Sequence, residues 1–160
     1  MQIGPYCIIE DQVVIGDGCQ LSSSILIKKK TTIKKNCRIF HGAVIGEIPQ
    51  DIKYAGEDSE VIVGNDTIIR EYSTIHRGTV ENKQTTIGNN CLLMAYSHVA
   101  HDCTISNHVI LSNGVQIGGH VIIDEHAIIG GMTPVHQFSH IGCYSFIGGG
   151  LRVVQDIPPY

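Results

Sequence analysis

The chain has 160 residues and a formal net charge of −4, and only 16% of its residues are charged. This length suffices for one domain whose core needs no disulfides or metals, and the weak charge gives no reason to expect binding to nucleic acid or membrane surfaces. No apolar stretch approaches the ~18 residues of a membrane helix. Because the start at Met1 has neither a basic region nor a long apolar run, we expect a cytoplasmic protein without signal peptide or membrane insertion.

The dominant feature is a repeat of six residues. From Ile3 to Val153, every sixth position holds Ile, Leu or Val, except at Asp51, Glu57 and Glu81. An α-helix, with 3.6 residues per turn, would spread such a stripe around all its faces. A short strand followed by a bend suits it, because six is a multiple of the strand period of two. The repeat therefore predicts a parallel β-solenoid.

Residues 1–45 follow this repeat without interruption. Within them, the lysines at 28–30 and 34–35 recur at the same offsets on successive repeats, which predicts one basic patch. Such a patch is either a solvated face or a landing area for an acidic carrier protein.

Two segments leave the repeat, residues 46–62 and 76–86, and we expect both to be loops outside the solenoid. Loops of this kind often carry function. The repeat then continues to Val153 and ends before Pro158 and Pro159, which cannot continue a strand ladder. We expect residues 1–160 to form a single solenoid domain with these two excursions.

The chain has six cysteines, and no two form a Cys-x-x-Cys pair. Five of them share one phase of the repeat, two positions before the aliphatic stripe: Cys7, Cys19, Cys37, Cys91 and Cys103. Because that phase favours small residues and a free cysteine behaves as a small hydrophobe, we expect packing there rather than disulfides or metal binding. No role is assigned to Cys143.

The segment Ser97–Asp102 carries the strongest chemical signal. It places His98 and His101 three residues apart, with the carboxylate of Asp102 directly after the second imidazole. A neutral imidazole accepts a proton at neutral pH, and an adjacent carboxylate fixes its tautomer. If three repeats make one coil, His120 stacks on Asp102. The cluster therefore predicts an acid–base site.

Metal binding is the alternative for any histidine cluster. Some proteins of this solenoid class resemble carbonic anhydrases, whose zinc ligands include a His-x4-His pair, and no two histidines here have that spacing. We therefore expect no metal, and a metal-dependent hydratase remains the disfavoured hypothesis.

The repeat resembles the hexapeptide repeat of left-handed parallel β-helix acyltransferases, which implies a triangular all-β helix and a homotrimer. Five motifs and the chain's last six residues resemble those of the UDP-N-acetylglucosamine acyltransferases, which catalyse the first step of lipid A synthesis. These are residues 50–57 (QDIKYAGE), 75–80 (IHRGTV), 101–104 (HDCT), 129–133 (IGGMT), 135–138 (VHQF) and 155–160 (QDIPPY).

That resemblance implies non-covalent acyl transfer. His101 would be the general base, Asp102 its orienting carboxylate, and the Gly119 amide the oxyanion donor. Sugar, diphosphate and nucleotide would be bound by Asp51, Lys53, His76, His98, His120, His136 and Gln137. Gly149 would be the acyl-chain ruler, and its missing side chain leaves room for a longer acyl group. No cofactor would be bound, because acyl carrier protein brings its own phosphopantetheine.

Two departures from the family pattern bear on this expectation. The chain begins about one coil later than typical members, and the helical C-terminal domain that follows Pro-Pro-Tyr in the family lies outside the sequence. Two further hypotheses therefore stay open: an N-acyltransferase acting on a related amino nucleotide sugar, and a non-catalytic trimeric scaffold.

Overall fold

The computed structural model describes all residues, Met1–Tyr160, as 22 short strands without a helix. The strands form three parallel sheets. Sheet A contains β1 (Gln2–Ile3), β4 (Gln20–Leu21), β7 (Arg38–Ile39), β10 (Ile68–Ile69), β13 (Leu92–Leu93), β16 (Ile110–Leu111), β19 (Ile128–Ile129) and β22 (Phe146–Ile147). Sheet B contains β2 (Ile8–Ile9), β5 (Leu26–Ile27), β8 (Val44–Glu47), β11 (Thr74–His76), β14 (His98–Val99), β17 (Gln116–Ile117) and β20 (Pro134–Val135). Sheet C contains β3 (Val14–Ile15), β6 (Thr31–Ile33), β9 (Glu60–Val63), β12 (Gln84–Ile87), β15 (Thr104–Ile105), β18 (Ile122–Ile123) and β21 (His140–Ile141).

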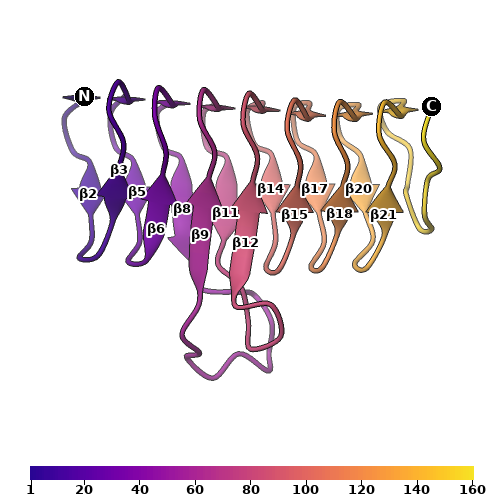
Figure 1. Cartoon of the computed structure of the whole chain (residues 1–160), viewed down its shortest axis with the longest axis horizontal. Helices are drawn as coiled ribbons and strands as arrows, with labels where there is room; N and C mark the ends of the chain where they lie inside the picture. The colour runs from indigo at the N-terminus through magenta and orange to yellow at the C-terminus, as the bar shows by residue number, and fades with distance from the viewer.

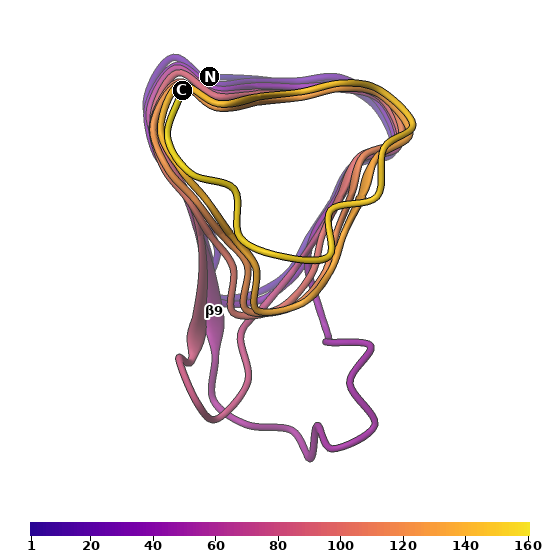
Figure 2. The same ribbon diagram turned by 90° about the vertical axis from the view of Figure 1, so that its right-hand side faces the viewer.

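The chain visits the three sheets in turn (Figure 1), and its coils outline a triangular prism (Figure 2). With the C-terminal end toward the viewer, successive coils run clockwise as they approach (Figure 2). The result is a left-handed parallel β-helix, as the repeat and the resemblance predicted. No segment has the helical length and hydropathy required to span a bilayer.

The register follows from the repeat, because three hexads return the chain to the same sheet. Ile105 on β15 pairs with Ile123 on β18, and Ile123 pairs with Ile141 on β21. The aliphatic stripe points inward on all three sheets, and together with the inward residues two positions before it forms one core cluster of 31 buried residues. Residues eighteen apart are therefore stacked neighbours wherever no excursion intervenes.

Each corner of the prism turns through a left-handed residue, usually at a position divisible by six. Asp102 has φ 59°, His120 φ 60° and Phe138 φ 64°. Aspartate and histidine are among the non-glycine residues that adopt this conformation more often than most. We call the corner between sheets A and B the first, that between B and C the second, and that between C and A the third.

The cysteines of the shared phase pack as predicted. Cys19, Cys37, Cys91 and Cys103 are buried and Cys7 is half-buried, and all are free thiols. The thiol of Cys103 donates to the carbonyl of Gly118 at 3.0 Å. Burial raises the pKa of Cys103 to about 12 and that of Cys37 to about 11, so these thiols stay protonated.

Both excursions leave the prism at the second corner (Figure 2). The first connects β8 to β9 through residues 48–59, and the second connects β11 to β12 through residues 77–83. Both are shorter than the sequence predicted, because β8, β9, β11 and β12 continue beyond the regular two residues. Arg77, at the start of the second excursion, is buried and donates to the carbonyls of Gly46 and Lys29.

The single basic patch expected from the lysines is wrong. Lys28–Lys30 lie at the second corner, whereas Lys34 and Lys35 follow β6 and lie at the third. A six-residue offset moves a side chain to the next corner rather than to the same one. Two of the lysines are also paired with carboxylates, Lys28 with Glu10 and Lys30 with Asp58.

Candidate functional site

The second corner gathers nearly all of the predicted site residues, because both excursions and the histidine-bearing turns meet there. Two columns with the eighteen-residue spacing define it. One column contains His101, Gly119 and Gln137, and the next contains Asp102, His120 and Phe138. The structure therefore confirms that Asp102 and His120 stack, as the sequence predicted.

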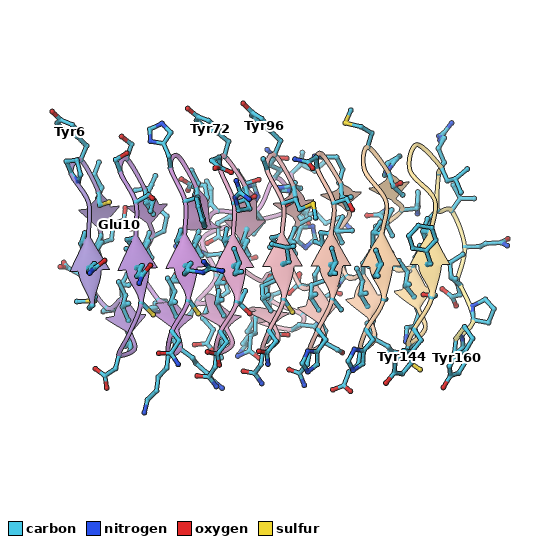
Figure 3. The ribbon with its side chains drawn as sticks, turned by 90° about the horizontal axis from the view of Figure 1, so that it is seen from above. Tyr6, Glu10, Tyr72, Tyr96, Tyr144 and Tyr160 are labelled. Atoms are coloured by element: carbon cyan, nitrogen blue, oxygen red, sulfur yellow. The ribbon has the colours of Figure 1, made fainter.

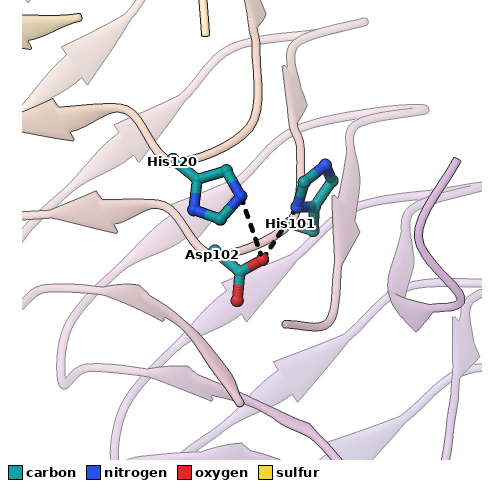
Figure 4. Close-up of side chains that lie close together, drawn as sticks. All are labelled: His101, Asp102 and His120. Carbon is teal, nitrogen blue, oxygen red and sulfur yellow. Dashed lines mark hydrogen bonds and ion pairs between the residues drawn. The ribbon is translucent and has the colours of Figure 1, made fainter. Parts of the chain in front are cut away.

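His101 and Asp102 form a hydrogen-bonded pair at the centre of this corner (Figure 4). The Nδ1 atom of His101 lies 2.8 Å from Oδ2 of Asp102. The imidazole side chain is 13% exposed and the carboxylate 0% exposed. An ionised carboxylate only accepts hydrogen bonds, so Nδ1 carries the proton and Nε2 is left to accept one.

The carboxylate of Asp102 is charged although it is buried. Burial by itself raises the pKa of this group, but hydrogen bonds from Thr79 and His101 outweigh that effect and hold the pKa below its usual value. The Thr79 hydroxyl donates to Oδ2 at 2.6 Å and the Thr79 backbone N–H donates to Oδ1 at 2.9 Å. Asp102 is therefore ionised at neutral pH beside His101.

His120 is a second imidazole that faces the same carboxylate. Its Nε2 lies 3.6 Å from Oδ2 of Asp102, and its Nδ1 lies 3.7 Å from the carboxylate of Glu81. The rings of His101 and His120 meet edge to face, with centroids 5.0 Å apart, and His120 stacks on Phe138 at 4.6 Å. Donor atoms of His101, Asp102 and His120 lie within 4.8 Å of one another, so these three side chains are the residues that could hold a metal ion.

Gly119 lies directly beside the imidazole of His101. A Cβ atom at this position would sit 2.6 Å from both Cε1 and Nε2 of the ring, so only glycine leaves the ring in place. The N–H of Gly119 donates no hydrogen bond within the chain, whereas the flanking N–H groups of Gly118 and His120 bond to Val135 and His101. This free donor is available to an oxyanion formed next to His101.

Two cavities flank His101. The first, of about 420 Å³, lies between the first excursion and the second corner. It is lined by Gln50, Asp51, Ile52, Lys53, Tyr54, Glu57, Thr79, Val80, Glu81, His101, His120, Gln137 and Phe138. The second, of about 350 Å³, lies against sheet B and is lined by Gln50, His76, His98, Ala100, His101, Gln116, Ile117, Gly118, Pro134 and Val135. His101 is accessible from both cavities.

His76 and His98 face each other in the second cavity, with ring centroids 4.7 Å apart. Burial lowers the pKa of both imidazoles, and repulsion from the positive charge of nearby protonated histidines lowers it further. The pKa of His98 falls to about 4. His98 Nδ1 hydrogen-bonds the hydroxyl of Thr74 at 2.7 Å. The Nδ1 atom of His76 is buried without a partner, so this neutral pair has spare hydrogen-bonding capacity for a ligand.

Two predicted site residues lie away from both cavities. His136 is exposed on the second corner and lines a smaller hollow of about 110 Å³ with Arg152. Gly149 follows β22 and is exposed at the first corner, a different edge of the prism from His101. No role was predicted for Thr79, Glu81, Gln116 or Phe138. Thr79 belongs to the motif at residues 75–80, and Phe138 shares the eighteen-residue column of Asp102.

The chain is similar to known proteins in both sequence and structure. Residues 84–119 match the family model described as bacterial transferase hexapeptide (six repeats). The acyl-[acyl-carrier-protein]–UDP-N-acetylglucosamine O-acyltransferase of Gloeothece citriformis is 48% identical over 85% of this chain and 49% of its own length. The structure of LpxA from Acinetobacter baumannii superposes with a TM-score of 0.98 at 47% identity, covering 99% of this chain and 62% of that one. LpxA from Bacteroides fragilis, a UDP-N-acetylglucosamine acyltransferase, is 39% identical with a TM-score of 0.85, covering 97% and 68%. The chain thus spans about half to two thirds of these relatives.

Proposed function

Because the chain belongs to the family of UDP-N-acetylglucosamine acyltransferases, we propose that it transfers an acyl group from acyl carrier protein to the 3-hydroxyl of UDP-N-acetylglucosamine. This is the first step of lipid A synthesis. The observation that carries the proposal is the His101–Asp102 pair, held at 2.8 Å where two cavities meet.

In the proposed mechanism, Nε2 of His101 removes the proton of the sugar 3-hydroxyl as the oxygen attacks the thioester carbonyl. The new C–O bond gives a tetrahedral oxyanion, to which the N–H of Gly119 donates. Collapse of this intermediate breaks the C–S bond, and the imidazolium of His101 returns its proton to the phosphopantetheine thiolate. The anion of Asp102 stabilises that imidazolium throughout.

The residues that line the two cavities suggest where the nucleotide sugar binds. Asp51 and Lys53 of the first excursion, with His120 and Gln137 of the coils, line the first cavity. His76 and His98, both with lowered pKa values, supply neutral donors and acceptors in the second. We assign both groups to sugar and diphosphate binding. His136, exposed beyond these cavities, is assigned to the nucleotide together with Gln137.

We also propose that no metal takes part. The two oxygens of Asp102 already accept three hydrogen bonds, two from Thr79 and one from His101. A metal ion on Oδ2 would have to displace one of them, and displacing His101 would remove the base from its orientation. No resident cofactor is needed, because the acyl group arrives on the phosphopantetheine of its carrier.

A homotrimer is proposed as the active form. Gly149, the proposed acyl-chain ruler, lies on a different corner from His101 of the same chain. We therefore assign the ruler at each His101 site to Gly149 of a neighbouring copy. Sheet A supplies a flat apolar stripe for such a contact, formed by the outward side chains of Ile68, Leu92, Ile110, Ile128 and Phe146.

We also propose a cytoplasmic location and a single domain. The six free thiols fit the reducing cytoplasm, and one continuous core fits a single domain over residues 1–160.

The proposal is tested by incubating the protein with UDP-N-acetylglucosamine and a series of acyl carrier proteins, and by detecting the acylated nucleotide sugar by mass spectrometry. We expect O-acylated product from the wild type and none above background from His101→Ala. A folded trimer that forms no product would contradict the proposal and favour the scaffold hypothesis. Transfer only to an amino sugar nucleotide would contradict the assigned acceptor.

A further inference from the structure

The second excursion converges on Asp102, although it has no place in the six-residue repeat. Thr79 donates two hydrogen bonds to the carboxylate, one to each oxygen. The side-chain amide of Asn82 donates to the carbonyl of Asp102 at 3.4 Å, and the hydroxyl of Thr85, at the start of β12, accepts the Asp102 backbone N–H at 2.9 Å. Two residues of the excursion and one of the strand that follows it therefore fix the position of Asp102.

We propose that Thr79 is a positioning residue, which holds the carboxylate of Asp102 in the orientation that presents Oδ2 to His101. This inference rests on the proposed function, because it gives a role in the acyl transfer to a residue that never touches the substrate. Thr79 is 6% exposed and lies at the floor of the first cavity.

The geometry of the two hydrogen bonds explains why Thr79 controls orientation. An ionised carboxylate has no proton to give, so the Thr79 hydroxyl must donate. At 2.6 Å this is a short, charge-assisted bond. The hydroxyl and the N–H of Thr79 hold one carboxylate oxygen each, so rotation of the carboxylate about its Cβ–Cγ bond would break both bonds at once.

A competing imidazole makes this orientation necessary. Nε2 of His120 lies 3.6 Å from the same oxygen that accepts the proton of His101. A carboxylate released by Thr79 is free to turn toward His120. His101 would then lose the acceptor that keeps its proton on Nδ1, and the proton would be free to occupy Nε2, the atom that must accept the substrate proton.

The charged groups around Asp102 offer no substitute for Thr79. His101 and His120 face the carboxylate from the coils, and Glu81 of the second excursion faces His120. No lysine or arginine forms an ion pair with Asp102. The hydrogen bonds from Thr79 and His101 therefore offset the burial that would otherwise raise the pKa of this carboxyl.

The test compares Thr79→Val, which keeps the shape and the backbone N–H but removes the hydroxyl, with Thr79→Ser, which keeps the hydroxyl. Thr104→Val is the matched control, because Thr104 is exposed on β15 and hydrogen-bonds nothing through its side chain. Circular dichroism first checks that every variant is folded.

The first readout is the tautomer of His101, measured by nitrogen-15 NMR of the imidazole at a pH where it is neutral. We expect Nδ1–H in the wild type, in Thr79→Ser and in Thr104→Val, and a mixture of tautomers in Thr79→Val. An unchanged tautomer in a folded Thr79→Val protein would overturn the proposal. This measurement needs no substrate, so it decides the role of Thr79 even if the wild type proves inactive and the proposed function fails.

The second readout is steady-state acyl transfer. For Thr79→Val we expect kcat to fall about 10- to 100-fold, the range for losing one hydrogen bond to a charged group, with KM changed less than about threefold. Thr79→Ser should stay within about threefold of the wild type. Equal losses in the serine and valine variants, or a rise in KM as large as the fall in kcat, would contradict the proposal.

Discussion

The second and third corners of the prism each bring two histidine rings together, but the two pairs differ in geometry and in surroundings. At the third corner, His108 and His126 stack face to face with centroids 4.6 Å apart. The stack continues through Tyr144 and Tyr160 along one edge, opposite the edge that carries Tyr72 and Tyr96 (Figure 3). At the second corner, His101 and His120 meet edge to face with the carboxylate of Asp102 next to both.

The two corners share the same backbone turn, so the coil itself does not create the site. His108 and His126 have left-handed φ angles of 59° and 62°, and Asp102 and His120 have 59° and 60°. The difference lies in what covers the turn. The excursions bury Asp102 and enclose a cavity at the second corner, whereas the third corner remains open. The regular solenoid thus supplies the spacing, and its interruptions supply the burial and the hydrogen bonds that set the charge of the Asp102 carboxylate beside His101.

The largest effect is expected from removing one imidazole at each corner. His101→Ala should lower kcat by about 10³-fold, because a positioned general base contributes about 10²–10⁴-fold to such a reaction. His126→Ala, at the third corner, should leave kcat within about twofold, since that histidine faces no buried carboxylate. The measurement is acyl transfer at saturating substrate. Comparable losses of kcat in the two variants would contradict the assignment of the reaction to the second corner.

Gly119→Ala should have the next largest effect on turnover. Its Cβ would lie 2.6 Å from the imidazole of His101, so the ring must move away from Asp102 to make room. We expect kcat to fall about 10-fold or more, as for the loss of one oriented hydrogen bond, while the melting temperature changes little. Gly131→Ala, at the first corner, is the control, because a Cβ there meets only a carbonyl oxygen at 3.2 Å. A fully active Gly119→Ala enzyme would contradict the placement of His101.

The buried imidazoles should make stability depend on pH. The pKa of His98 is about 4 in the folded chain, against 6.5 for the free side chain, because burial penalises its charge. Between these values the unfolded chain binds a proton that the folded chain does not, so stability is full above pH 6.5 and falls as the pH drops toward 4. His98 alone contributes at most about 3 kcal/mol to this loss, at 1.36 kcal/mol per pKa unit.

Urea unfolding at fixed protein concentration measures this slope. His98→Gln should flatten the change in unfolding free energy between pH 6.5 and 4, whereas His108→Gln, exposed at the third corner, should keep the wild-type slope. Identical slopes in the two variants would show that His98 is not the buried titrating group.

The smallest expected effect is a change in the preferred acyl-chain length rather than in kcat. Gly149→Met adds a side chain at the first corner, where the glycine is exposed and the new Cβ would lie 3.1 Å from the carbonyl oxygen of Gly131. If a neighbouring copy presents this surface to the acyl chain, the preferred acyl group should become shorter by several carbons with little loss of stability. A mixture of acyl carrier proteins of different chain length, analysed by mass spectrometry, gives the answer. An unchanged product distribution would reject Gly149 as the ruler.

The six-residue repeat predicted a parallel β-solenoid, whereas its three sides, its hand and the eighteen-residue spacing of stacked residues were predicted from the family resemblance. The aliphatic stripe fixed the inward face, and the eighteen-residue stacking brought His120 onto Asp102. The same reasoning failed for Lys28–Lys30 and Lys34–Lys35, because six residues move the chain to the next corner. Thr79 and Glu81 were not predicted as site residues, since the excursions that contain them have no repeat from which a position can be derived.

The most direct test of the account is a crystal structure of the protein with UDP-N-acetylglucosamine. We expect the sugar in the cavities that flank His101, with its 3-hydroxyl about 2.6–3.2 Å from Nε2 of His101, the range within which a base can take the proton. A sugar bound at another corner, or a 3-hydroxyl turned away from that nitrogen, would contradict the claim that the second corner is the acyl-transfer site.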